Sequence, residues 1–282
     1  MQGNIRAKKS LGQNFLKSGA ILGEIVKAGE VSSDDFIVEI GPGKGSLTKK
    51  LLETGATVLA IEKDYRLIEF LNEKFEESIS TKKLQILEGD VLELDLEKDL
   101  PENFLNKKYK LVANIPYYIT GLIIEKFLSS KNSPVDAILM VQKEVCDRIV
   151  ARDNKESILS MSVKAYSEPK YIKKVPAKFF SPAPRVDSAI IKLGNISKKV
   201  FEENNVLEDV FFKIVRAGFS HKRKILISNL KEWQKKNSNK ARTDQNTKIY
   251  EIDFSEKFNK QNIDLKIRAE NLQVKDWINL IK

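Results

Sequence analysis

Residues 36–45 read Phe-Ile-Val-Glu-Ile-Gly-Pro-Gly-Lys-Gly, and this stretch decides the fold class. Its first five residues are apolar except for one acid, which predicts a short strand with both faces buried. Three glycines at alternate positions follow, and residues 46–54 after them have helical character. A buried strand, a glycine turn and a helix in this order indicate the start of an α/β unit with a parallel sheet.

The same alternation continues along the chain. Apolar segments predict further strands, and segments with a helical stripe predict the connections between them. The expected strands are residues 56–61, 84–87, 109–113, 135–141 and 186–193, and the expected helices are residues 64–77, 120–129 and 142–153. The pattern predicts an α/β fold, a Rossmann-like doubly wound parallel sheet with helices on both faces.

The character of the sequence changes after this sheet. Residues 206–218, 220–236 and 274–281 are expected to be helical, and the remaining length is too short for a second α/β unit. We therefore expect two domains, a catalytic domain over residues 1–197 and a small α-helical domain over residues 198–282.

Composition limits the possible partners and the compartment. The 282 residues include 49 Lys and Arg against 39 Asp and Glu, which gives a net charge of +10 and favours a polyanionic partner. A single cysteine, Cys146, excludes an internal disulfide and fits a reducing, cytoplasmic location. The lone His221 argues against a histidine-based metal site, and no apolar run is long enough for a membrane helix.

The glycine loop restricts the type of ligand. Its spacing is G-x-G-x-G, whereas a dinucleotide fingerprint needs a glycine where Ser46 stands. A Walker loop would need Gly-Lys-Ser/Thr after four intervening residues, which this loop also lacks. Gly41 and Gly43 therefore suit a nucleoside ligand without a pyrophosphate, and S-adenosylmethionine is the candidate.

Polar residues follow the carboxyl ends of the expected strands, where open α/β sheets bind ligands. Glu62 stands about twenty residues after the loop, in a position to accept hydrogen bonds from ribose hydroxyls. Asp90 can accept from an adenine amine, and Val91 can pack on the ring. Glu39 precedes the glycines and can orient the loop or a methionine amine.

The fourth strand is followed by Asn114-Ile115-Pro116-Tyr117, which suits a planar exocyclic amine. The Asn114 oxygen can accept a hydrogen bond from an NH2 group, Pro116 adds no competing N–H, and Tyr117 can stack on a base. Two acceptors on such an amine aim its lone pair at an electrophile, which an amino-methyltransferase requires. A strand end with a turn and a buried tyrosine is the alternative interpretation.

Basic residues gather in two segments that flank these motifs. The first seventeen residues carry four Lys or Arg and no acid, and residues 219–242 carry eight against one. Their position favours contacts with RNA phosphates. The candidate RNA-binding residues are Lys8, Lys9, Arg185, His221, Lys222, Arg223 and Lys224.

Several motifs together resemble the ribosomal RNA adenine N6-dimethyltransferases. They are Lys9-Ser-Leu-Gly-Gln-Asn-Phe-Leu16, the Glu39–Gly45 loop, Glu62-Lys63-Asp64, Gly89-Asp90, Asn114-Ile-Pro-Tyr-Tyr118 and the segment Val175–Ser188. The match covers residues from about 8 to about 230 and is nearest to the small-subunit (16S rRNA) KsgA/RsmA branch. In that branch two adjacent adenosines of a hairpin loop near the 3′ end of 16S rRNA are dimethylated, as part of small-subunit biogenesis.

The resemblance implies roles that the residues alone do not reveal. Gln13, Asn14 and Leu16 would line the cofactor site from an N-terminal segment, and Phe180 would close the target pocket opposite Tyr117. Lys63 and Asn114 would join the cofactor contacts. His221 stands where the family more often has Gln, which makes it an RNA-facing or structural donor.

The resemblance also implies a partner, 16S rRNA in the small ribosomal subunit, and a monomeric enzyme without metal or membrane. Three alternatives remain open at this point. One is the erythromycin-resistance (Erm) branch, which modifies large-subunit rRNA, and another is a non-catalytic ribosome-assembly factor. The third, a nicotinamide oxidoreductase, is disfavoured by the glycine spacing.

Overall fold

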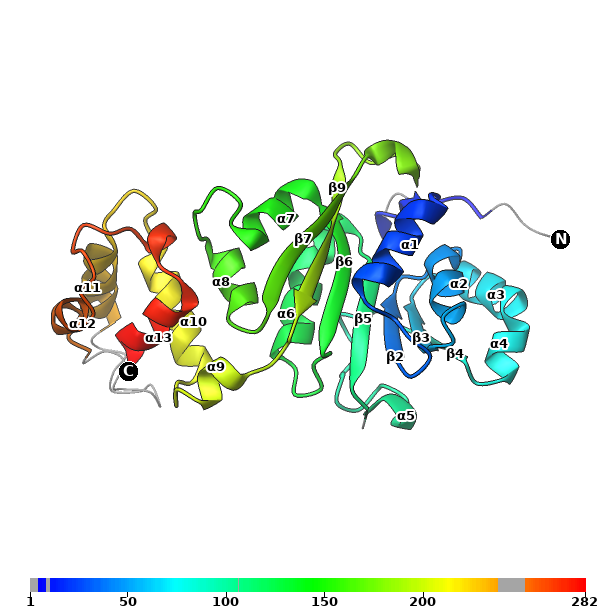
Figure 1. Ribbon diagram of the computed structural model, residues 1–282, viewed down its shortest axis with the longest axis horizontal. Coiled ribbons are helices and arrows are strands. Elements are labelled where there is room, and N and C mark those ends of the chain that lie inside the picture. Colours follow the sequence, from blue (N-terminus) through cyan, green and yellow to red (C-terminus); the bar gives the residue numbers. More distant parts are fainter. Residues whose placement is uncertain (1–4, 9–10, 106, 238–251) are drawn as a thin grey trace. The chain divides into compact units, whose positions relative to one another are not determined.

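A computed structural model describes residues 5–8, 11–105, 107–237 and 252–282 of the chain (Figure 1). By its contacts the chain divides into two compact units. The first comprises residues 1–146 and 167–197, and the second comprises residues 147–166 and 198–282.

A seven-stranded sheet forms the centre of the first unit. Its strands, in spatial order, are β4 (Leu84–Glu88), β3 (Thr57–Glu62), β2 (Phe36–Ile40), β5 (Tyr109–Asn114), β6 (Asp136–Gln142), β9 (Ser188–Gly194) and β7 (Glu168–Val175). The first five strands are parallel, and β9 runs antiparallel to both of its neighbours. The order reverses between β2 and β5, which places a ligand crevice at their carboxyl ends.

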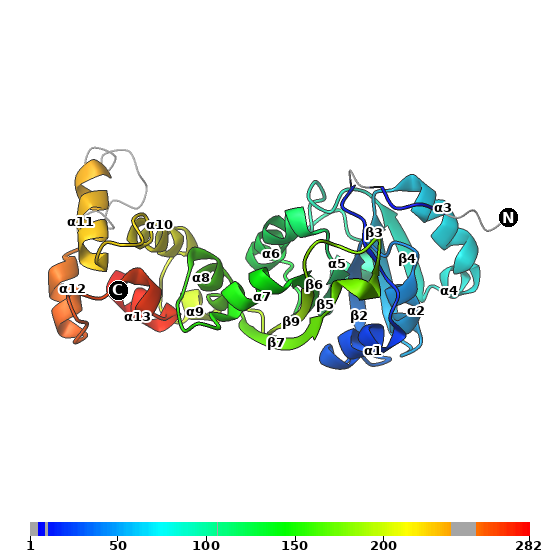
Figure 2. The ribbon, with the colours of Figure 1, turned by 90° about the horizontal axis from the view of Figure 1, so that it is seen from above.

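Helices cover both faces of this sheet. Figure 2 shows α1 (Gly19–Ala28) and α2 (Ser46–Leu52) on one face and α6 (Thr120–Ser129) on the other. The other helical segments of the unit are α3 (Tyr65–Lys74), α4 (Glu76–Ser80), α5 (Glu102–Leu105) and the short 3₁₀ turns η2 (Tyr117–Ile119) and η3 (Ala177–Phe179). The α/β fold with helices on both faces is thus confirmed.

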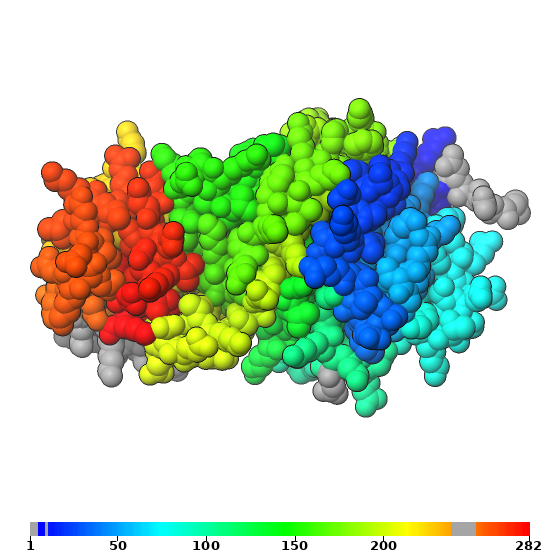
Figure 3. Space-filling view, in the orientation of Figure 1, coloured from blue at the N-terminus to red at the C-terminus, as the bar shows by residue number. Residues whose placement is uncertain are grey.

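A buried apolar cluster joins the sheet to α1 and α2. It includes Ile25 of α1, Leu51 of α2 and the inward side chains of β2 and β3, all nearly free of solvent contact. Burial of such side chains is the main force that fixes the sheet and helices together. On the surface in Figure 3, α1 lies beside the β7–β9 strands, and Lys173 and Lys192 form ion pairs there with Glu24 and Glu30.

Strand β7 was not expected, and its sequence explains why. Glu-Pro-Lys-Tyr-Ile-Lys-Lys-Val has three lysines, one acid and a proline, and it contains a bulge between Tyr171 and Lys173. Charge, proline and bulges are typical of edge strands, which must avoid pairing with other chains. The parallel sheet expected from the sequence is present in the five strands from β4 to β6, and β9, expected as a closing strand, runs antiparallel beside them.

A second, two-stranded sheet holds the N-terminal segment. Strand β1 (Phe15–Leu16) pairs with β8 (Phe180–Ser181), so that Leu16 lies opposite Phe180. Two segments that are far apart in the sequence are thereby fastened together, and the segment preceding β1 is placed over the first unit.

The second unit is helical in its described part. Its helices are α8 (Ile158–Lys164), α9 (Lys199–Glu202), α10 (Glu208–Gly218), α11 (Leu226–Asn237), α12 (Phe254–Lys260) and α13 (Val274–Ile281), with the 3₁₀ turn η6 (Ala269–Asn271). Helix α7 (Lys143–Val150) runs from one unit into the other. Residues 220–225, expected as the start of a helix, form a turn instead, and α11 begins at Leu226.

The segment 147–166 belongs to the second unit, whereas the sequence-based division placed it in the first. Aromatic packing accounts for this. The Tyr166 ring packs against Phe201 and Phe212, with centroids 5.4 and 5.8 Å away. Such contacts between residues distant in sequence leave no periodic signal.

Gly45 provides a test of the turn that leads into α2. Its φ is +71°, and a Cβ there would overlap the Phe75 ring. We expect Gly45→Ala to lower the free energy of unfolding by roughly 1–3 kcal/mol, measured by urea denaturation. Gly23→Ala is the control, because Gly23 is exposed within α1 and a Cβ there meets nothing within 4 Å. It should stabilise the protein by about 0.5–1 kcal/mol, and an equal loss in both variants would contradict this role of Gly45.

Candidate active site

A cleft opens in the first unit at the carboxyl ends of the parallel strands. It is lined by the N-terminal residues 11–16, the glycine loop, the ends of β3 and β5, and the segment after β4. Every cofactor candidate from the sequence lines this cleft: Gln13, Asn14, Leu16, Glu39, Gly41, Gly43, Glu62, Lys63, Asp90, Val91 and Asn114. Parallel strands end at one edge of a sheet, which brings these residues together.

The glycine loop offers open backbone to the cleft. Gly41 has a φ of +63°, its N–H donates to the Ile61 carbonyl over 2.9 Å, and a Cβ there would meet nothing within 4 Å. At Gly43 a Cβ would lie 3.0 Å from the Phe15 ring. A side chain at Gly41 would therefore extend into free space, which glycine leaves to a ligand.

Glu62 has a rigid position at the end of β3. Its side chain is almost fully buried and accepts backbone hydrogen bonds from Lys63 (3.0 Å), Asp64 (2.9 Å) and Gly43 (3.4 Å). Burial raises the pKa of this carboxyl, while the three N–H groups oppose the shift by stabilising the charge. A carboxylate has about four acceptor positions, so Glu62 keeps capacity for a ligand's hydroxyls.

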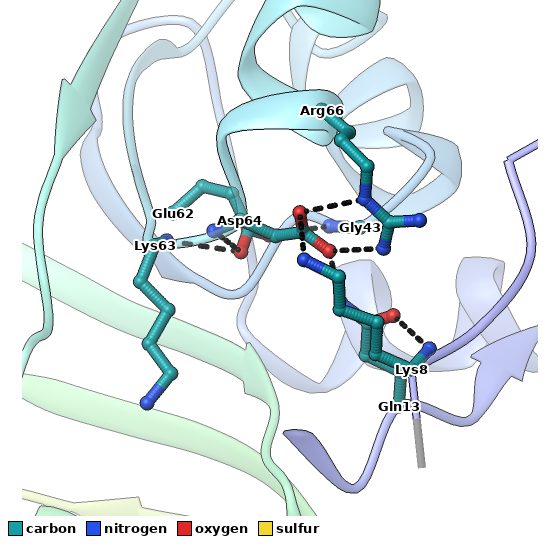
Figure 4. Close-up of polar contacts among 7 residues, drawn as sticks. All are labelled: Lys8, Gln13, Gly43, Glu62, Lys63, Asp64 and Arg66. Carbon is teal, nitrogen blue, oxygen red and sulfur yellow. Dashed lines mark hydrogen bonds and ion pairs between the residues drawn. The ribbon is translucent and has the colours of Figure 1, made fainter. Parts of the chain in front are cut away.

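Asp64 attaches the N-terminal segment to the cleft (Figure 4). Its buried carboxylate accepts from Arg66 (2.7 Å to Nη2), Gln13 Nε2 (3.1 Å) and Lys8 Nζ (3.2 Å). The Arg66 guanidinium, followed by Gln13 and Lys8, holds the pKa of Asp64 well below its usual range despite the burial. Gln13 in turn accepts from the Lys8 backbone N–H through Oε1, over 2.8 Å. The predicted cofactor residue Gln13 thus owes its position to Asp64.

Lys63 and Asp90 form an ion pair of 2.9 Å at the rim of the cleft. Asp90 also accepts from the Leu92 N–H over 3.0 Å, and its neighbour Val91 is buried against the cleft. Burial raises the pKa of Asp90, but the Leu92 and Lys63 hydrogen bonds outweigh it and lower the pKa overall. Asp90 therefore remains an ionised acceptor in the region expected for an adenine ring.

Glu39 is the most deeply buried acid of the cleft. Burial raises the pKa of its carboxyl to about 8, and the polar groups of Thr48 only partly oppose the shift. One of its oxygens, Oε2, has no hydrogen-bond partner among the described residues. An unpaired buried oxygen is costly, and it favours a protonated acid or a nearby donor.

Asn114 ends β5, the strand that pairs with β2, and contacts the N-terminal segment. Its Nδ2 donates to the Asn14 carbonyl over 3.1 Å, and Asn14 Nδ2 donates to the Gly12 carbonyl over 3.1 Å. Because the NH2 end of Asn114 is engaged in this contact, its Oδ1 remains as an acceptor.

The residues after Asn114 form a compact turn. The Pro116 carbonyl accepts from the Ile119 N–H over 3.2 Å, and the Tyr117 hydroxyl pairs with Ser188 Oγ of β9 over 2.6 Å. Burial raises the pKa of Tyr117, so the phenol stays neutral. Tyr118 is 60% exposed and lies against Gly12. The Tyr117 ring is therefore fixed at the mouth of the cleft, while that of Tyr118 faces solvent.

Phe180 differs from the other candidates. It is buried in the apolar cluster with Leu16 and does not line the cleft. Its role in closing a target pocket stays a prediction.

The predicted RNA-binding residues fall into separate places. Lys8 pairs with Asp64, Arg185 is exposed in the first unit, and Lys9 lies outside the described residues. His221, Lys222, Arg223 and Lys224 are exposed in the turn between α10 and α11, and Lys224 pairs with Glu232 over 2.9 Å. Across the described ranges no cluster of His, Cys, Asp and Glu could hold a metal, and no helix is long and apolar enough to span a membrane.

Asp64 and Arg66 were missed by the sequence reasoning. Asp64 immediately precedes α3, where an acid usually caps the helix, but its side chain makes no capping bond. In the sequence Asp64 is the last residue of the motif Glu62-Lys63-Asp64, and this motif does not reveal contacts with residues 8 and 13.

Comparisons with known proteins agree with this geometry. The sequence profile of the family described as "Ribosomal RNA adenine dimethylase" matches residues 4–282. A protein of Fusobacterium nucleatum named "Ribosomal RNA small subunit methyltransferase A" is 39% identical over 278 residues, covering 98% of this chain and 96% of the relative. One of the same name from Dehalococcoides mccartyi is 36% identical over 280 residues, with coverage of 98% and 88%.

Solved structures support the same fold. A dimethyladenosine transferase from Plasmodium falciparum has a TM-score of 0.77 and 28% identity, covering 94% of this chain and 95% of its own. The 23S rRNA methyltransferase ErmE has a TM-score of 0.71 at 20% identity, covering 95% of this chain and 98% of its own. At that identity the second likeness concerns the fold alone.

Replacement of Asp64 tests its link to the cleft. We expect Asp64→Asn to weaken binding of S-adenosylhomocysteine roughly tenfold in calorimetry, because Gln13 loses its ionic anchor. Asp35→Asn removes another ion pair of the same unit, with Lys110 at 2.9 Å, outside the cleft. The control should bind within about twofold of the wild type. Equal losses in the two variants would mean that Asp64 acts on general stability and not on the cleft.

Glu39 predicts a dependence of stability on pH. Its pKa rises from 4.5 to about 8 in the folded protein, so folding favours the protonated acid. The protein without ligand should lose stability as the pH rises from about 4.5 to about 8, while Glu39→Gln should show less of this loss. Urea denaturation at pH 5 and pH 8 measures both proteins. Identical pH profiles would show that Glu39 is ionised in the fold.

Proposed function

The chain belongs to the family of ribosomal RNA adenine dimethylases, and from this premise we propose that it methylates N6 of two adjacent adenosines in 16S rRNA. The methyl donor is S-adenosylmethionine, and the target lies in a hairpin loop near the 3′ end of the small-subunit RNA. The observation that carries the proposal is Asn114, whose free Oδ1 lies in the same cleft as Glu62 and Asp90.

The cofactor residues fit S-adenosylmethionine in their chemistry. Glu62 would accept from the ribose hydroxyls, Asp90 from the adenine amine, and Val91 would pack on the adenine ring. Open backbone at Gly41 leaves room for the ligand, and Glu39, with its unpartnered oxygen, suits the methionine amine. When bound, the cofactor supplies an electrophilic methyl group on a sulfonium.

Asn114 and its turn would orient the target amine. The Oδ1 of Asn114 accepts one N6 hydrogen, and a backbone carbonyl of the turn accepts the other. The Pro116 carbonyl is already bonded to Ile119, so the preceding carbonyl, of Ile115, is the better candidate. Tyr117, held by Ser188, would stack on the adenine after the base leaves its loop.

The chemistry needs positioning more than proton abstraction. Asn114 and Ile115 would hold N6 as a neutral amine with its lone pair directed at the methyl group that S-adenosylmethionine would supply, and the N6 proton would leave afterwards to water. A neutral amine held by two acceptors therefore requires no basic side chain.

Dimethylation requires space for an amine that already carries one methyl group. Ile115, which is buried, and Tyr118, which is mostly exposed, both line the cleft. We therefore assign the shaping of this space to these two residues.

The names of similar proteins favour small-subunit rRNA over large-subunit rRNA as the substrate. The proteins with 36% and 39% identity over almost the whole chain carry the small-subunit name, while the Erm structure shares only the fold. We infer a monomeric, cytoplasmic enzyme that acts during small-subunit biogenesis. A purely structural assembly factor is disfavoured, because Asn114, Glu62 and Asp90 are all present in one cleft.

The test is methylation of undermethylated 30S particles by the protein, followed by mass spectrometry of the digested rRNA. We expect N6,N6-dimethyladenosine at two adjacent positions, and Asn114→Ala should lower the rate roughly 100-fold or more, because the amine loses an acceptor. Affinity for the particles should stay within about threefold, since Asn114 contacts a single base.

Asn132→Ala is the matched control. Asn132 also donates to a backbone carbonyl of the first unit, that of Leu96 over 2.9 Å, but lies outside the cleft. Its rate should match the wild type. Methylation of large-subunit rRNA alone would move the protein to the Erm branch, and tight binding without methylation would leave only the assembly role.

A further inference from the structure

A second cavity lies wholly within the second unit and has a volume of about 320 Å³. Four segments form its walls: the end of α7, the residues just before and at the start of α8, the turn between α10 and α11, and η6. Figure 1 shows α8 next to α10, and the contact between these two helices brings the wall segments together. The volume exceeds that of a single nucleobase, so the cavity can accept a group of that size.

The charge of this second cavity is unbalanced in favour of cations. Each of its two acids has a lysine partner, Glu156 with Lys164 over 2.6 Å and Glu270 with Lys155 over 3.4 Å, although the second oxygen of Glu156, Oε2, is buried without a hydrogen bond among the described residues. Arg148 and Lys222 also line the cavity, and neither has an ion-pair partner in the part of the chain that the structure describes. Two cations without an internal acid favour an anionic ligand such as a phosphate.

The same cavity has an apolar side. Ile158 is 41% exposed at its edge and offers an apolar surface there. Phe219 also lines the cavity, and its ring stacks on Trp277 with centroids 5.9 Å apart. A ligand with both a phosphate and a flat apolar ring matches this combination.

The walls are held in place before any ligand arrives. Asn229 Nδ2 donates to the Gly218 carbonyl over 2.7 Å and to the His221 carbonyl over 3.1 Å, which fixes the turn after α10. The Glu156 N–H donates to the Glu270 carbonyl over 2.8 Å, which joins two other walls. A preformed cavity loses little conformational entropy on binding.

We propose that the second cavity binds one unpaired nucleotide of the RNA substrate, with its phosphate at Arg148 and Lys222 and its base against Ile158 and Phe219. A paired base within a helix cannot enter such a cavity, so the nucleotide comes from a loop or bulge. The proposal rests on the proposed function, because it takes the substrate to be a ribosomal RNA. It extends the expected phosphate contact of Lys222 to a complete nucleotide site that includes Arg148 and Ile158.

The experiment measures binding of the full-length protein to undermethylated 30S particles at several salt concentrations. We expect Lys222→Ala to weaken binding roughly three- to tenfold and to reduce the slope of log K against log salt by about 1. Ile158→Ser should weaken binding by a similar factor without changing this slope, because it removes no charge. Lys275→Ala is the matched control, since Lys275 is exposed on α13, outside the cavity and outside both basic segments, and should change affinity less than about twofold.

Ultraviolet crosslinking of the wild-type protein, followed by peptide mass spectrometry, provides a second measurement that needs no variant. A nucleotide adduct on residues 156–158 or 218–224 is expected. Equal effects of Lys222→Ala and Lys275→Ala, no effect of Ile158→Ser, or adducts confined to other surfaces would each overturn the nucleotide site. If the wild type methylates the particles but the binding and crosslinking results contradict these expectations, nucleotide binding by the second cavity is refuted and the proposed function stands.

Discussion

The arrangement of the cleft depends on one buried carboxylate, that of Asp64. Its backbone N–H donates to Glu62, and its side chain binds Lys8, Gln13 and Arg66. A buried acid without these partners would be strongly unfavourable, so the cations and the amide are needed to keep it charged. In satisfying this one charge, the chain attaches its N-terminal segment to the strand end that carries Glu62.

Two adjacent residues of that segment contact the two halves of the cleft. Gln13 binds Asp64 beside the expected cofactor position, and the Asn14 carbonyl accepts from Asn114 beside the expected target position. Because neighbouring residues share a peptide bond, a shift of the segment at one contact displaces the other. The hydrogen bond at Asn14 also fixes which end of the Asn114 amide is free for an amine. The expected cofactor and target positions are therefore joined by a short stretch of backbone.

The features that depend on local sequence pattern and on sheet geometry, namely the parallel strands and the polar residues at their ends, could be predicted from the sequence. Buried parallel strands have continuous apolar runs, and their polar ends share one edge, so the sequence alone could place Glu62, Asp90 and Asn114 in one cleft. Strand β7 could not be predicted in this way, because edge strands are polar. Asp64 was missed because its partners are about fifty residues away. The same holds for residues 147–166, which join the second unit through Tyr166.

A count of basic residues in the sequence treats every lysine alike. The capacity of a lysine to bind phosphate also depends on whether it already forms an ion pair with an acid of the protein. Lys8 is engaged with Asp64 and Lys224 with Glu232, so binding RNA there would have to compete with an internal partner. Lys222 and Arg148 have no such partner in the described structure. Counterion release favours cations that exchange only salt ions for phosphate. The unpaired cations around the second cavity, and not the total charge of +10, should therefore dominate the salt dependence of RNA binding by this unit.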